Sequence, residues 1–230
     1  MKKKKSAFDL LLAPKISSPS IEKPLAADFY QTDVVTLAKA LLGKIIVRRL
    51  PDGKKIKVMI VETEAYKAPE DKACHAYNNK KTDRTKYFWT DGGHLYIFSI
   101  YGPNNCMNIV AADKTRPEAV LLRAVEPIDG LDIIKSNRKI NCKKIKDLTN
   151  GPAKLTKAIQ IDKAFNGFDL TQKDAAVYLI ENDGYKFETM VSKRVNIDYA
   201  EEWIEKPWRF YIKDNDFVTL KFKTDKTLNE

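Results

Sequence analysis

The sequence predicts an α+β domain built on antiparallel strands. Segments rich in β-branched and aromatic residues follow one another across short turns, with few helical segments between them. This order fits antiparallel pairing better than the regular alternation of strands and helices that indicates a parallel sheet. The chain has 230 residues, 43% of them hydrophobic, which is enough for a sizeable core and favours one domain over two.

The first predicted helix spans residues 34–42, where apolar side chains recur on one face. Thr32 or Asp33 is suited to its N-cap, and Gly43 is suited to the position just after its end. Two further helices are predicted over residues 129–138 and 151–159, the second because proline is common in a first helical turn.

The first predicted strands, residues 44–50 and 55–66, lie on either side of the turn-forming residues 51–53. They are therefore expected to pair as a hairpin. Later segments with the composition of strands are residues 95–101, 107–111, 119–125, 176–181, 189–195, 209–213 and 218–222.

The start of the chain differs in composition from the rest. Residues 1–26 are rich in Lys, Pro and Ser, which predicts a flexible basic arm before a domain that spans residues 27–230. The formal net charge of +10 suits a nucleic-acid partner, because basic side chains neutralise phosphates and release counterions. Many basic proteins bind no nucleic acid, so charge alone leaves the partner open.

The cysteines and the hydropathy pattern indicate an intracellular protein. The three cysteines are odd in number and widely spaced, which argues against a disulfide framework and for a reducing compartment. The apolar run before Pro14 is short and interrupted by Asp9, unlike a signal peptide. No stretch approaches the length of a membrane span. We expect a monomer with no membrane association, in the bacterial cytoplasm or nucleoid, or in the nucleus of a eukaryote.

The strand that ends near Tyr66 carries two carboxylates. Alternate residues of a strand share a face, so Glu62, Glu64 and Tyr66 point the same way. Beside apolar neighbours, one of these carboxylates could act as a general base. The common alternative for such a pair is one solvated carboxylate and one ion-pair partner.

His75 is one of only two histidines. It is a candidate metal ligand, base or hydrogen-bonding pocket residue, and a lone histidine is most often structural. Because its only companion is His94 and no closely paired cysteines occur, the sequence does not predict a zinc site. A magnesium site stays open, with the candidate ligands Glu62, Glu64, Glu70 and Asp71.

Aromatic residues gather at the predicted hairpin near residue 100. Tyr96 and Phe98 have the usual pattern of core residues. Tyr101 directly precedes Gly102 at the expected tip, where burial is harder. An exposed ring on a turn of a basic protein is a candidate wedge between stacked bases.

A series of motifs runs in order along most of the chain, from about residue 27 to 218. They are VETEAY at 61–66, PED at 69–71, His75, LY at 95–96, YG at 101–102, CMN at 106–108, LLRAVEP at 121–127, GPAKL at 151–155 and PWRFY at 207–211. Together they resemble the alkyladenine family of DNA glycosylases, also called 3-methyladenine or methylpurine-DNA glycosylases.

The resemblance implies an enzyme that flips alkylated or deaminated purines out of double-stranded DNA and hydrolyses the N-glycosidic bond. Glu64 matches the residue that activates the attacking water, and Arg123 matches an arginine that borders this water. Tyr101 matches a tyrosine that intercalates from a protruding hairpin through the minor groove. The family fold is a single mixed domain, here expected as a curved antiparallel sheet with flanking helices. Its members need no metal or organic cofactor and leave an abasic site uncut.

The resemblance also implies a pocket for the flipped base. Tyr66 matches the stacking residue, His75 a contact to the purine edge, and Asn108 a residue that helps to exclude normal purines. Phe98 stands where tyrosine is common, so stacking is kept and a hydroxyl contact is lost. The turn at residues 102–105 also departs from the bulkier version typical of the family.

Two other functions stay open from the residues alone. One is a damaged-DNA binding module without turnover, against which the presence of both Glu64 and His75 argues. The other is a carbohydrate glycosidase that uses Glu62 and Glu64, roughly 7 Å apart on one strand face and near the spacing of inverting enzymes. The basic charge argues against this second function. The preferred lesion, among 3-methyladenine, 7-methylguanine, hypoxanthine and ethenoadenine, is open.

Overall fold

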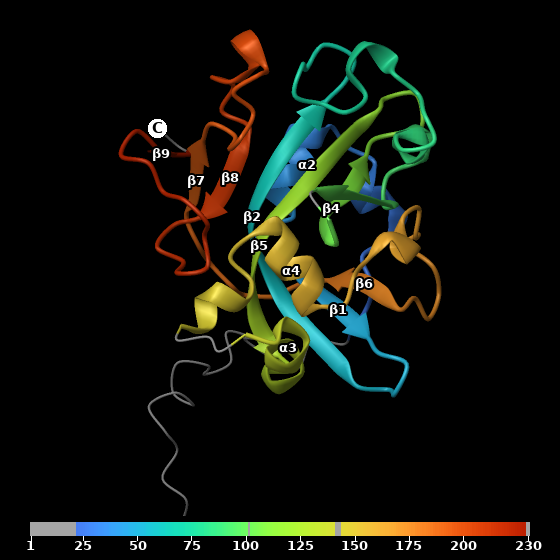
Figure 1. Ribbon diagram of the computed structural model, residues 1–230, viewed down its shortest axis with the longest axis vertical. Helices are drawn as coiled ribbons and strands as arrows, with labels where there is room; N and C mark the ends of the chain where they lie inside the picture. Colours follow the sequence, from blue (N-terminus) through green and yellow to red (C-terminus); the bar gives the residue numbers. More distant parts are fainter. Residues whose placement is uncertain (1–21, 101, 141–143, 229–230) are drawn as a thin grey trace, which may run out of the picture.

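The longest strand, β2 (Lys55–Lys67), organises the sheet in the computed structural model, which describes residues 22–100, 102–140 and 144–228. One edge of β2 pairs along its length with β5 (Glu118–Asp129). The other edge pairs first with β1 (Ile45–Arg49) and then with β8 (Arg209–Ile212). Because this edge pairs with two strands in succession, β2 connects β1 on one side and β8 on the other within a single sheet (Figure 1).

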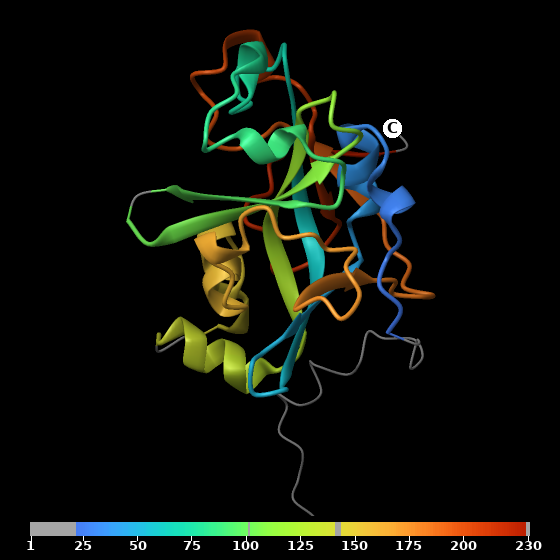
Figure 2. The ribbon, with the colours of Figure 1, turned by 90° about the vertical axis from the view of Figure 1, so that its right-hand side faces the viewer.

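All strand pairings among the described residues are antiparallel, which confirms the predicted fold class. The main path through the sheet runs β3-β4-β5-β2-β8-β7-β9, and β1 and β6 branch from β2. The remaining strands are β3 (Leu95–Ile100), β4 (Asn104–Ala111), β6 (Val177–Ile180), β7 (Thr189–Ser192) and β9 (Lys226–Thr227). The β3–β4 hairpin projects away from the body of the molecule (Figure 2).

The pairing of β2 with β5 is irregular at the centre of β2. The register shifts between Ile60 and Glu62, and again between Glu62 and Thr63. The shifts leave Val61 of β2 and Arg123 of β5 without a partner in the other strand, and such bulges increase the local twist. Glu62 therefore lies within this irregularity, and Glu64 and Tyr66 follow it.

Helices cover both faces of the sheet. Helix α2 (Val34–Ala40) lies behind β2 and β5 in Figure 1, where Ala38 O accepts a hydrogen bond from Thr63 Oγ1 at 2.8 Å. Helices α3 (Leu131–Arg138) and α4 (Pro152–Ala158) pack together on the opposite face. None of the helices in the described ranges combines the length and apolarity that crossing a bilayer requires.

The predicted strand at residues 218–222 is wrong. Backbone groups there bond to side chains instead of a neighbouring strand: Thr219 N donates to Glu62 Oε2 at 2.7 Å, and Leu220 O accepts from Arg209 Nη1 at 2.9 Å. The last strand forms later, where β9 pairs with β7. Charged side chains of the core thus override the local strand propensity.

The chain pairs with the sheet before the predicted start of the domain. Leu25 is buried, and its N–H donates to Leu179 O of β6 at 2.8 Å. Glu22 forms ion pairs with Lys55 and Lys57, and their hydrogen bonds lower the pKa of its carboxyl to about 2. These contacts attach residues 22–26 to the strands that flank β1.

Replacing Asp33 by Ala should destabilise the protein by about 1 kcal/mol, the usual value of an N-cap. Asp33 Oδ1 accepts from the backbone N–H groups of Val35 and Thr36, whereas Thr32, the other candidate, forms no such cap. Urea unfolding of Asp33→Ala and of the control Thr32→Ala measures the difference. A larger loss in the Thr32 variant would contradict this assignment.

Candidate active site

Four adjacent strands form the floor of a cavity, because their register aligns side chains on one face. Tyr96 on β3 lies opposite Asn108 on β4. Leu121 on β5 lies opposite both Asn108 and Glu64 of β2. Directly opposed residues of antiparallel strands project from the same face. One row across the sheet therefore brings together a ring, an amide, an apolar side chain and a carboxylate.

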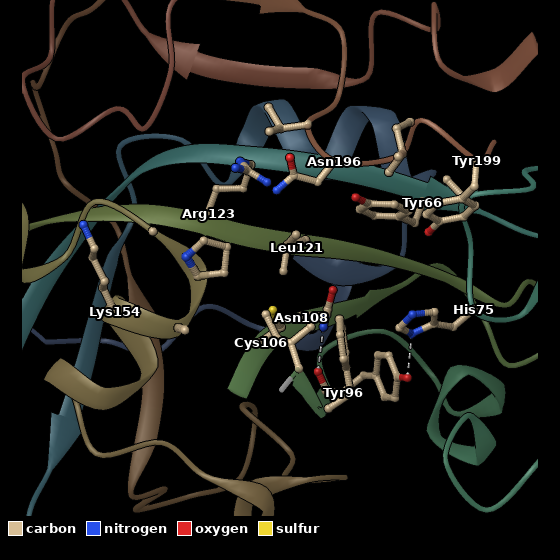
Figure 3. A pocket seen from close by; sticks show the side chains of 18 of the residues that line it. Tyr66, His75, Tyr96, Cys106, Asn108, Leu121, Arg123, Lys154, Asn196 and Tyr199 are labelled. Carbon is tan, nitrogen blue, oxygen red and sulfur yellow. Dashed lines mark hydrogen bonds between the residues drawn. The ribbon is translucent and has the colours of Figure 1, made fainter. Parts of the chain in front are cut away.

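The cavity above this floor has a volume of about 650 Å³, within the usual range for small-molecule sites. Its sides are the loop between β2 and β3, the first turn of α4 and the loop after β7 (Figure 3). Six aromatic or imidazole rings are among the residues that line it: Tyr66, His75, Phe88, Tyr96, Phe98 and Tyr199. Flat rings on several sides suit a planar, apolar-faced ligand.

Glu64 is fully buried beneath the floor, and both carboxylate oxygens have donors. Tyr66 Oη donates to Oε2 and the Val195 backbone N–H donates to Oε1, each at 2.8 Å. Arg123 Nη1 lies 3.3 Å from Oε1. These partners hold the carboxylate in one orientation. Glu64 does not itself line the cavity, but the three residues around it do.

Glu62 is also fully buried, so the alternative of a solvated carboxylate is wrong for both residues. Its Oε1 accepts from Arg123 Nε at 3.0 Å, Arg209 Nη1 at 2.8 Å and Thr219 Oγ1 at 2.7 Å, and its Oε2 accepts from Thr219 N. Glu62 does not contact the cavity. With its oxygens occupied by four donors, Glu62 is a structural ion-pair partner and not a free base.

Arg123 connects the two carboxylates and lines the cavity. Burial lowers the pKa of its guanidinium, but the charges of Glu64 and Glu62 outweigh burial and raise that pKa. The guanidinium therefore stays protonated and supplies a fixed positive charge at the back of the cavity.

The buried guanidinium of Arg194 packs against the ring of Tyr66. The guanidinium carbon of Arg194 lies 4.7 Å from the Tyr66 ring centre and 5.2 Å from that of Trp208. Asp71 in turn binds Arg194 through two hydrogen bonds. Burial, together with the charge of Glu64, raises the pKa of the Tyr66 hydroxyl. It therefore stays protonated and able to donate to Glu64.

His75 faces Tyr66 across the cavity (Figure 3). Its Nδ1 lies 2.9 Å from Tyr96 Oη and its Nε2 lies 3.3 Å from Arg84 Nη2. Burial and the Arg84 charge lower the pKa of the imidazole to about 4, so His75 is neutral at pH 7. Because a guanidinium only donates, Nε2 is the acceptor and the ring proton sits on Nδ1.

The other two predicted pocket residues also line the cavity. Phe98 stacks on Tyr96 with ring centres 5.5 Å apart and meets His75 edge-on at 4.5 Å. Asn108 Nδ2 donates to Tyr96 O at 2.9 Å, which turns its carbonyl oxygen toward the cavity (Figure 3). Tyr101 lies outside the described residues, so its role stays a prediction.

The four carboxylates considered for magnesium do not assemble. Glu62 and Glu64 bind arginines, Asp71 binds Arg194, and Glu70 is exposed. Among the described residues, no group of three or more His, Cys, Asp or Glu side chains has the geometry of a metal site. The arrangement thus favours buried ion pairing as the use of these carboxylates.

Sequence reasoning missed the loop after β7. Val195, Asn196 and Tyr199 line the cavity, and the Val195 backbone N–H holds Glu64. A backbone donor leaves no signal in the residue type, so no motif pointed to it. Lys154 also lines the cavity, and here a signal existed, since its motif at residues 151–155 stood out without an assigned role.

Comparison with known proteins identifies the family. Residues 28–216 match the family described as Methylpurine-DNA glycosylase (MPG). A relative from Natranaerobius thermophilus is 48% identical over 193 residues, which covers 84% of this chain and 97% of the relative. A relative from Clostridium novyi is 47% identical over 205 residues, covering 86% of this chain and 100% of the relative. Both carry the name "Putative 3-methyladenine DNA glycosylase". The chain belongs to the methylpurine-DNA glycosylase family and is a DNA glycosylase of DNA repair.

Replacing His75 by Gln should flatten the acid dependence of stability. The folded-state pKa of about 4 lies below the ordinary value of 6.5. Between these pH values the unfolded chain binds a proton that the folded protein does not, so stability falls as pH drops through this window. Urea unfolding at pH 7 and pH 4.5 should show that wild type loses about 2 kcal/mol more than His75→Gln. The control His94→Gln should follow wild type, and identical pH dependence in all three proteins would refute the assignment.

Proposed function

We propose that the protein removes alkylated or deaminated purines from duplex DNA by hydrolysing the N-glycosidic bond with a water activated by Glu64. The observation that carries this proposal is the Glu64 carboxylate, buried beneath the floor of a ring-lined cavity and oriented by the lining residues Tyr66, Val195 and Arg123. The names of the relatives from Natranaerobius thermophilus and Clostridium novyi support 3-methyladenine as a substrate.

A base inside the duplex cannot reach such a cavity, so the target nucleotide is extruded at a cost of a few kcal/mol. Stacking on Tyr66 contributes about 1–3 kcal/mol toward that cost. Arg194 behind the ring keeps Tyr66 in place, so little ordering of this side chain remains to be done on binding. Damaged bases are extruded more easily, which supplies part of the selectivity.

The bond that breaks joins the sugar C1′ to a purine nitrogen, and its electron pair leaves with the base. The sugar then has oxocarbenium character, which a nearby carboxylate stabilises. Glu64 takes a proton from water while the hydroxyl adds to C1′, which leaves an abasic site and an uncut strand. A purine alkylated at N3 or N7 is already cationic and departs without prior protonation. Arg123 Nη1, 3.3 Å from Glu64 Oε1, places a positive charge beside the carboxylate that this role uses.

Access of water is a specific requirement of this proposal, because Glu64 is completely covered. The Tyr66 hydroxyl covers Oε2 on the cavity side. Rotation of the Tyr66 O–H bond away from Oε2 frees this oxygen to accept a proton from water, while the ring stays in place against Arg194.

The polar groups that face the cavity select among bases. In this proposal His75, which is neutral, contacts the purine edge. The Asn108 amide, held by its bond to Tyr96 O, helps to exclude normal purines, notably guanine with its exocyclic amino group. A pocket group that clashes with the amino group of a normal base, or leaves that amino group without a hydrogen-bond partner, weakens binding of the normal base. Binding of a base without this amino group is not affected.

Glu64→Gln should abolish excision, with DNA affinity largely retained. The substitution keeps the shape of the side chain and removes the charge and the proton acceptor. The assay is single-turnover incubation, in the presence of EDTA, with duplexes that carry one hypoxanthine, one ethenoadenine or one alkylated purine, followed by alkaline cleavage. The control Glu70→Gln alters an exposed carboxylate and should match wild type.

The outcomes separate the candidate functions. Excision that persists in Glu64→Gln would move the base to another residue, with Glu62 next. Tight binding of damaged duplex by wild type without any excision would instead support a DNA-binding module. The saturated hydrogen bonding of Glu62 argues against a glycosidase that uses Glu62 and Glu64 together.

Tyr101→Ser should weaken binding to both a lesion duplex and an abasic product duplex, because a wedge fills the gap left by the flipped nucleotide. Equilibrium titration with labelled duplexes measures both affinities. Unchanged affinity for both would rule out intercalation by this residue.

A further inference from the structure

The segment from Phe217 to Thr227 lies beyond the region that matches the family, which ends at residue 216. It follows β8 and returns to β7, next to which it forms β9 (Figure 1). Two of its side chains, Thr219 and Asp225, nevertheless bond to buried charges of the sheet. Residues that follow the family match thus contact the side chains that position Arg123.

The buried charges form a chain of alternating sign. It runs from Asp225 through Arg209, Glu62 and Arg123 to Glu64, with nitrogen–oxygen distances of 3.5, 2.8, 3.0 and 3.3 Å. The Arg209, Glu62 and Glu64 side chains are 0% exposed and that of Asp225 is 3% exposed. Water is therefore excluded from most of these ion pairs. The stability of each pair then depends on the charged groups next to it in the series.

Thr219 forms hydrogen bonds with two neighbouring members of this series, Glu62 and Arg123. Its hydroxyl donates to Glu62 Oε1 at 2.7 Å and accepts from Arg123 Nη2 at 3.4 Å. Its N–H donates to Glu62 Oε2 at 2.7 Å. Arg123 is then held at Nε by Glu62 and at Nη2 by Thr219, which directs its remaining nitrogen, Nη1, toward Glu64.

We infer that Thr219 is a positioning residue for the excision reaction, acting through Arg123 on Glu64. The inference rests on the proposed role of Glu64. A guanidinium is planar, so two fixed nitrogens determine where the third one lies. Without the Thr219 hydroxyl, Arg123 loses one of its two anchors and Glu64 loses a fixed partner.

Thr219→Val tests the inference, because valine keeps the shape and the backbone N–H but lacks the hydroxyl. We expect the single-turnover excision rate to fall about tenfold, the effect of losing one hydrogen bond to a charged group. Affinity for the lesion duplex should change less than about twofold, since Thr219 does not line the cavity. Thr219→Ser, which restores the hydroxyl, should recover most of the rate. Thr224→Val is the matched control, since Thr224 is exposed on the same segment.

A second readout is independent of catalysis. The Arg123 Nε–H, which donates to Glu62, should exchange with solvent about tenfold faster in Thr219→Val than in wild type, measured by nitrogen–proton NMR spectra of the arginine side chains. The signal is assigned by its loss in Arg123→Lys. Thr224→Val should leave the exchange rate as in wild type.

The outcomes distinguish the positioning of Arg123 by Thr219 from the proposed excision activity. Normal exchange and normal excision in Thr219→Val would overturn the inference, as would equal losses in the valine and serine variants, which would indicate the methyl group. A wild-type protein that excises no lesion, but whose Arg123 exchange still depends on the Thr219 hydroxyl, would reject the proposed function and retain the positioning of Arg123.

Discussion

The pairing of buried carboxylates with buried guanidiniums is the constraint on which the rest of this structure depends. Glu62 and Arg209 have no exposed surface, and a charge left unpaired in such a place destabilises a protein by several kcal/mol. Their pairing joins β2, in the first third of the chain, to β8 near its end. The same pairing explains why residues 218–222 are irregular, because Thr219 and Leu220 bond to these charges instead of to a strand.

The ion pairs also determine how the candidate site is organised. Arg123 has Glu62 on one side and Glu64 on the other, so the structural carboxylate positions the cation that serves the proposed catalytic one. A second buried pair, Asp71 and Arg194, does the equivalent for the ring of Tyr66. In both cases a group at the cavity is held by charges behind it, an arrangement that reduces reorganisation when a ligand binds.

Prediction from sequence succeeded where the signal is local. The helix that begins at Val34, the hairpin of β1 and β2 and the hairpin of β3 and β4 each follow from periodicity and turn residues within a short window. The strand predicted at residues 218–222 failed, because its backbone partners are side chains on β2 and β8. The resemblance to a glycosylase family, carried by motifs along most of the chain, agrees with the family match.

The sequence alone determined that Glu62, Glu64 and Tyr66 share one face of a strand, since alternation is a property of every extended chain. Only the tertiary structure decided which partners each glutamate has: Glu62 is bonded away from the cavity, whereas all the partners of Glu64 line it. Arg209 and Thr219, which saturate Glu62, lie 147 and 157 residues away, and the Val195 N–H that holds Glu64 lies 131 residues away. Contacts between residues so far apart in the sequence depend on which strands pair in the sheet, and no local sequence pattern determines that pairing.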